Sequence, residues 1–166
     1  VSCTFDGVAG LTPNWDTPDP KMRPTIRNII LRNTFAYSGY MEGAIIEDVV
    51  VENTRAGRGP IFLRGNAYKH VVLRGKIGPT EVRGKMFPST FLSSKKQEEI
   101  KCLWDEANAE FYRNVDWAID IREASFGSFS ISGIPSHLVR RDAETSVVVT
   151  REQALIGEWR NLPWAH

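Results

Sequence analysis

Apolar and polar residues follow one common pattern in three segments of the chain, residues 26–33, 46–53 and 68–75, which begin 20 and then 22 residues apart. Two alternate columns of this alignment are apolar throughout: Ile29, Val49 and Val71, and Leu31, Val51 and Leu73. Alternate residues of a strand point to one face, and a segment this short cannot bury its apolar face alone. The pattern therefore predicts parallel strands stacked as successive coils of a β-solenoid.

Charged residues in the same alignment support a parallel stack. Two columns alternate in sign: Arg27, Glu47 and Lys69, and Arg32, Glu52 and Arg74. Neighbouring strands lie about 4.8 Å apart, so opposite charges in one column attract. A further column, Asn33, Asn53 and Gly75, predicts a corner, because Asn and Gly tolerate the left-handed conformation of a tight bend.

Two further segments extend the same template. In residues 3–7, Phe5 matches Leu31 and Asp6 continues a charge column, which predicts a first coil. Residues 128–133 predict a later rung with the same pattern. One outward column is unexpectedly apolar: Ile30, Val50 and Val72. An apolar outer stripe predicts either a cover from the chain's own helix or a second copy of the chain.

A helix is predicted from Ser94 to about Arg113, where Ser94 and Gln97 form a capping box and apolar residues recur at helical spacing. We expect it to pack on the end or the apolar outer face of the solenoid. Residues 115–134 return to strand-like alternation, 146–149 predict another strand, and 150–153 a second helix start. The expected organisation is one domain in three parts: coils over 1–92, the helix over 93–114, and final strands with a C-terminal cap over 115–166.

Composition excludes several function classes. Of the 166 residues 42% are hydrophobic, and the formal net charge is +1, so nucleic-acid binding is not expected. No run reaches the ~18 apolar residues of a membrane helix. Cys3 and Cys102 lack metal-ligand spacing, so neither a metal nor a cofactor is expected. A cytoplasmic location is favoured, although the first residue, Val1, leaves a cleaved signal peptide open.

The coil length and the apolar–charged–Asn rhythm of residues 25–76 resemble right-handed parallel β-helix proteins of the pectate-lyase-like class; residues 1–8 and 126–133 resemble it more loosely. That resemblance implies acidic clusters for calcium or water activation, with an Arg or Lys base. Asp48 is the one aspartate of the regular coils, so no paired-Asp motif carries over. Pentapeptide-repeat proteins are a second resemblance, because apolar residues recur every five positions from Leu31 to Ile61.

Several polar groups are candidate sites. Asp48 and His70 share a column with Asn28, where they either share a proton, hold a cation, or simply occupy a bend. Arg74, with Arg32 and Glu52, forms either a site for an acidic sugar or a solvated ladder of salt bridges.

Two other groups are candidates, and the first of them is the favoured binding patch. This loop patch of aromatic residues and arginines is expected either to stack on sugar rings or to bind a partner protein: Phe35, Tyr37, Tyr40, Arg55 and Arg58. Asp116 and Asp120, with Arg122 beyond, form either an acidic site or charges that protect a strand edge.

The leading functional expectation is a non-enzymatic binding or scaffold protein. It would use the loop side or the apolar flank to bind a partner protein, a second copy of itself, or a glycan. The alternative is a small carbohydrate-active enzyme, a lyase or hydrolase acting on acidic polysaccharide. That alternative predicts a groove where Asp48, His70 and Arg74 converge.

Overall fold

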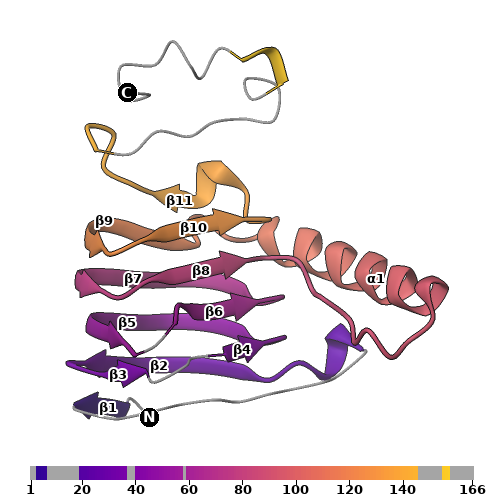
Figure 1. Cartoon of the computed structure of the whole chain (residues 1–166), viewed down its shortest axis with the longest axis horizontal. Coiled ribbons are helices and arrows are strands. Elements are labelled where there is room, and N and C mark those ends of the chain that lie inside the picture. The colour runs from indigo at the N-terminus through magenta and orange to yellow at the C-terminus, as the bar shows by residue number, and fades with distance from the viewer. Residues whose placement is uncertain (1–2, 7–18, 37–39, 58, 146–154, 158–166) are drawn as a thin grey trace.

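The computed structural model describes residues 3–6, 19–36, 40–57, 59–145 and 155–157, and this part of the chain is mainly β with one long helix (Figure 1). Its strands are β1 (Cys3–Asp6), β2 (Thr25–Arg32), β3 (Phe35–Ala36), β4 (Tyr40–Glu42), β5 (Ile45–Ala56), β6 (Ile61–Arg64), β7 (Ala67–Ile77), β8 (Thr80–Arg83), β9 (Ile119–Phe126), β10 (Phe129–Ser132) and β11 (Val139–Arg140). Its helices are α1 (Ser94–Tyr112) and the 3-10 helices η1 (Pro20–Met22) and η2 (Ser136–Leu138).

The described strands form two sheets in which every pairing is parallel. The large sheet has seven strands in the order β1-β2-β5-β7-β9-β11, with β3 beside β5; the small sheet has the order β4-β6-β8-β10. From β4 to β11 the chain alternates between the small and the large sheet. Figure 1 shows both sheets rising in chain order from β1 toward β11. The prediction of a mainly β protein with parallel strands is confirmed.

The register of the large sheet matches the predicted columns. Ile29 pairs with Val49, and Val49 pairs with Val71. The expected first strand is also in place, because Phe5 pairs with Leu31. The pattern of apolar positions therefore predicted which residues are neighbours across the strands.

Aligned bends interrupt the long strands of this sheet. The predicted corner is left-handed at Asn33, Asn53 and Gly75, with φ of 49°, 54° and 70°. A second column of left-handed residues lies five positions earlier: Asn28, Asp48 and His70, with φ of 57°, 53° and 54°. Positive φ is uncommon outside glycine, and Asn, Asp and His are enriched there. These polar residues therefore occupy bends, as one of the two interpretations of their column expected.

One predicted rung was assigned to the wrong sheet. Residues 128–133 were expected to continue the columns of Ile29 and Leu31, but β10 belongs to the small sheet, where Ile131 pairs with Val82. Ile119 of β9 pairs with Val71 instead. The short apolar alternation of β10 fits either sheet, and only the path of the chain decides between them.

The main core lies on the inner faces of the strands and includes Val49, Val71 and Ile119, each at most 5% exposed. The side-chain amide of Asn66, between β6 and β7, is also fully buried, at 0% exposure. Its Oδ1 accepts the N–H of Ala44 at 2.8 Å, and its Nδ2 donates to the carbonyl of Met41 at 3.1 Å. Asn66 thus satisfies two backbone groups of the preceding connection between the sheets.

The N-cap residue of helix α1 lies one position earlier than predicted. The side chain of Ser93, not Ser94, accepts the backbone N–H of Lys96 at 3.4 Å. Gln97 does not complete a capping box; its Nε2 donates to the carbonyl of Leu92 at 2.8 Å. Two successive serines offer the same signal, and the geometry of the preceding turn selects the first.

The packing of α1 corrects a second expectation. Its buried face, Ile100 and Trp104, packs with Met86, and Asn108 donates to the carbonyl of Gly84 at 2.9 Å. The helix therefore lies beside the segment that leaves β8, not on the outer apolar column, and the hydroxyl of Tyr112 accepts the N–H of Tyr68. The outer column is half-buried: Ile30, Val50 and Val72.

The predicted strand over 146–149 and the helix start over 150–153 lie outside the described residues. Cys102 is exposed and is not in a disulfide, while the side chain of Cys3 is not described. No helix in the described part of the chain combines the length and the apolar character needed to cross a membrane.

Candidate functional site

His70 bridges two carboxylates at the surface of the large sheet. Its Nδ1 lies 3.1 Å from Oδ1 of Asp48, and its Nε2 lies 2.7 Å from Oδ1 of Asp116. An ionised carboxylate only accepts hydrogen bonds. Both contacts are therefore hydrogen bonds at once only when both ring nitrogens carry hydrogen. The trio of Asp48, His70 and Asp116 thus places an imidazole between two carboxylates, and these are the side chains that most often act as general acids and bases.

The bends of the strands and the return of the chain from α1 create this trio. Asp48 and His70 occupy left-handed bends of the neighbouring strands β5 and β7. Asp116 comes from the segment between α1 and β9, which is hydrogen-bonded to β7: Val71 donates to the carbonyl of Ala118 at 3.0 Å. The trio therefore joins residues up to 68 positions apart, from Asp48 to Asp116.

Trp117 packs against the imidazole ring of the trio. Its ring lies 4.7 Å from the ring of His70, at an interplanar angle of 32°. The guanidinium carbon of Arg140 lies 4.3 Å from the Trp117 ring centre. Trp117 is half-buried, and these two contacts use ring surface that a sugar would otherwise stack on. We interpret Trp117 as an internal support, not as an open stacking platform.

The electrostatics of the trio follow from its hydrogen bonds. The hydrogen bond from His70 holds the pKa of the Asp116 carboxyl below its usual value, against a smaller opposing effect of burial. Asp116 and Asp48 are more than half exposed, with side-chain exposures of 68% and 54%. Water screens contacts at this exposure, so these two contacts contribute little to the stability of the fold.

Arg74 does not join Asp48 and His70 as the enzyme hypothesis expected. Its Nη2 lies 2.9 Å from Oε2 of Glu52, and Nε of Arg32 lies 3.4 Å from the same oxygen. The hydrogen bond from Arg74 is the main cause that lowers the pKa of Glu52. The alternating column is thus a ladder of ion pairs, and its guanidinium groups are already engaged.

Asp116 and Asp120 do not form a common acidic site. Arg122 binds both carboxylate oxygens of Asp120, with Nε 3.0 Å from Oδ1 and Nη2 2.6 Å from Oδ2. The hydrogen bond from Arg122 lowers the pKa of Asp120. Asp116 precedes β9 and bonds to His70 instead.

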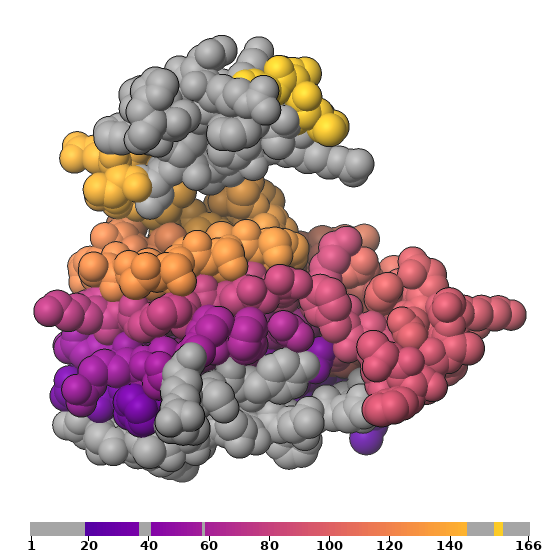
Figure 2. All heavy atoms as spheres, in the orientation of Figure 1, coloured from indigo at the N-terminus to yellow at the C-terminus, as the bar shows by residue number. Residues whose placement is uncertain are grey.

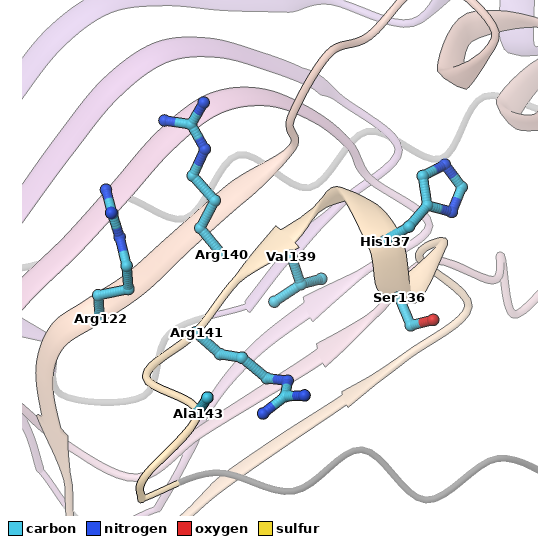
Figure 3. Close-up of a pocket in the computed structure, with 7 residues that line it drawn as sticks. All are labelled: Arg122, Ser136, His137, Val139, Arg140, Arg141 and Ala143. Carbon is cyan, nitrogen blue, oxygen red and sulfur yellow. The ribbon is translucent and has the colours of Figure 1, made fainter.

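A shallow pocket lies beside β11 and is lined by Arg122, Ser136, His137, Val139, Arg140, Arg141 and Ala143 (Figure 3). Three arginines in one pocket suggest an anion site. Figure 3 shows, however, that Arg122 and Arg140 extend to one side of the pocket and Arg141 to the other. Because the guanidinium groups do not converge, and Asp120 engages Arg122, the pocket lacks the geometry of an anion clamp.

The predicted loop patch is described only in part. Phe35 and Arg55 are exposed and pair across β3 and β5. Tyr37 and Arg58 lie outside the described residues, and the side chain of Tyr40 is likewise not described. Among the described residues no group of three or more His, Cys, Asp or Glu side chains is arranged to hold a metal ion.

Asp48 and His70 were predicted together, while Trp117 and Arg140 were missed and Asp116 was assigned to a different site. A signal for this was present in the sequence. Aligning Ile119 with Val71 would have placed Asp116 and Trp117 beside His70, but the alignment with residues 128–133 was preferred.

No protein-family model, no curated protein and no solved structure matches this chain.

Proposed function

We propose that this chain is a non-enzymatic binding protein, built as a short right-handed parallel β-solenoid that presents side chains to a partner protein. Parallel in-register strands, alternation between two sheets and aligned left-handed bends support the solenoid, because stacked coils repeat each of these features at every level. Solenoids commonly serve as extended binding surfaces.

One observation carries the non-enzymatic assignment: the titratable side chains of the candidate site are engaged with one another. Both ring nitrogens of His70 contact carboxylates. Glu52 is shared by two arginines, and Asp120 is bound by Arg122. A catalytic acid or base must reach the substrate proton directly or through one water. Here His70, with a carboxylate at each ring nitrogen, would first have to lose a present partner.

Acid–base cleavage of an acidic polysaccharide is the second candidate. Asp116 favours it, since it places a second carboxylate beside His70, and glycoside cleavage usually needs two. The pocket described above does not include this trio, because it is lined by residues of β9 and of the segment around β11.

The experiment that separates the two is a product assay on polygalacturonate, with and without calcium, for the natural sequence and the His70→Asn variant. We expect no new reducing ends or unsaturated products from either chain. Product formation by the natural sequence that the His70→Asn substitution abolishes would overturn the proposal and establish the enzyme. A thermal-shift series with the same polymer gives an independent readout of binding without cleavage.

A further inference from the structure

The turn that precedes α1 places large apolar side chains in solvent. Phe91 is 99% exposed and the next residue, Leu92, is 38% exposed. Figure 2 shows the helix and the segment before it projecting from the side of the stacked strands. A phenylalanine that contacts almost nothing in its own chain contributes nothing to folding, and neighbouring exposed apolar residues mark interaction surfaces.

Hydrogen bonds hold this turn in one conformation. The N–H groups of Phe91 and Leu92 donate to Ser89, to its hydroxyl at 3.3 Å and to its carbonyl at 3.1 Å. On the other side, Nε2 of Gln97 donates to the carbonyl of Leu92 at 2.8 Å. The apolar side chains are therefore presented on an ordered turn, which lowers the entropy cost of binding.

The first turn of α1 is positively charged, while Glu98 and Glu99 in the next turn pair with Lys101 and Lys96. The first turn of α1 carries Lys95 and Lys96 and no acidic residue. The helix N-terminus is itself the positive end of the helix dipole, so cations there are unfavourable for the helix alone. Lys96 has a partner, Glu99, at 3.3 Å, whereas no described carboxylate lies within ion-pair distance of Lys95. An acidic partner surface would give Lys95 a charge of the opposite sign, so this placement favours such a partner.

We propose that Phe91 and Leu92 dock into an apolar pocket on a partner protein whose rim carries carboxylates, with Lys95 and the N-terminus of α1 facing that rim. This inference rests on the proposed binding function and names the surface and the partner chemistry. Rigid apolar anchors surrounded by complementary charge are the usual arrangement at the centre of protein interfaces.

The test is photo-crosslinking of the full chain in an extract of its source cells. A benzophenone amino acid is introduced at position 91, and the same probe at position 144 is the control, because Glu144 is exposed and lies far along the chain from the turn. Mass spectrometry then maps the crosslinked peptide. We expect position 91 to label one peptide of one protein, rich in Asp or Glu beside apolar residues. Lys95→Glu, or about 0.5 M salt, should lower the yield about fivefold.

Other outcomes overturn the docking proposal. They are labelling that is equal from both positions, labelling that ignores Lys95→Glu and salt, a crosslink to a second copy of this chain, and the absence of any discrete adduct. Flotation with phosphatidylcholine vesicles containing about 30% phosphatidylserine tests the membrane alternative. Binding there that Phe91→Ser abolishes would likewise overturn a protein partner. None of these results depends on His70, so failure here is distinct from failure of the polygalacturonate test.

Discussion

The buried amide of Asn66 gives the sharpest stability prediction. In the natural chain it accepts the N–H of Ala44 and donates to the carbonyl of Met41 and to the hydroxyl of Tyr68. Asn66 and Ala44 are both 0% exposed, so water does not replace the lost contacts without rearrangement. Asn66→Ala therefore removes the partner of a buried N–H and of a part-buried carbonyl at once.

The magnitude follows from the cost of unpaired buried groups. Each buried donor or acceptor left without a partner costs about 1–3 kcal/mol. The N–H of Ala44 is fully enclosed, while the carbonyl of Met41 is only part-buried and recovers some hydration. We expect Asn66→Ala to lower the free energy of unfolding by about 2–4 kcal/mol, out of a total of roughly 5–15 kcal/mol.

Urea unfolding followed by circular dichroism measures this change. We expect a lower midpoint with an unchanged slope, because the surface exposed on unfolding stays the same. The control is Asn114→Ala: Asn114 is exposed, and that change should stay within about 0.5 kcal/mol. A loss below about 1 kcal/mol for Asn66→Ala would refute the assignment of the amide as an essential buried partner.

The Asn66→Asp variant adds a test with a definite sign. It keeps an acceptor for Ala44 but loses the amide donors and introduces a carboxyl in a dry site. Burial raises the pKa of such a carboxyl above its value in the unfolded chain. The folded state of the Asn66→Asp variant is therefore most stable at low pH, where the carboxyl is protonated, and its free energy of unfolding falls as pH rises. The deficit relative to the natural chain should be larger at pH 8 than at pH 5; an equal deficit would show that water reaches the site.

Three further predictions follow from packing, ionisation and charge. A methyl group on Gly84 would lie 2.4 Å from the carbonyl of Gly133, whereas the nearest atom at Gly127 is 3.5 Å away, so in urea unfolding Gly84→Ala should cost about 1–3 kcal/mol and Gly127→Ala less than 1. Burial raises the pKa of Tyr112 to about 12, above the usual value near 10. The stability that comes from the protonated Tyr112 hydroxyl is present below pH 10 and lost as pH rises toward 12. The melting temperature should therefore fall across that window, and less steeply in Tyr112→Phe. Glu52→Lys places three cations in one column and should lower the melting temperature in a way that salt relieves; a deficit independent of salt would exclude charge repulsion as its cause.

The repeat along the sequence determined the large sheet. The columns headed by Ile29 and Leu31 predicted the pairing of β2, β5 and β7, and Phe5 predicted β1. This worked because parallel in-register strands place equivalent residues side by side, so a repeat in the sequence becomes a column in space. The corner at Asn33, Asn53 and Gly75 was predictable for a local reason, since few residue types tolerate positive φ.

Other features depended on where the chain goes between the repeats. The sequence predicted that α1 exists and that Ile100 and Trp104 belong to its apolar face, but not that these two residues would pack with Met86 beside the exit of β8. It paired Asp48 with His70 and left out Asp116, which is 46 residues from His70 and arrives only after the helix has returned the chain to the sheet. The exposure of Phe91 could not be predicted either, because the sequence alone does not show whether another segment covers an apolar residue. Local pattern determines which residues form strands and bends, while long-range packing alone decides which side chains meet and which remain in solvent.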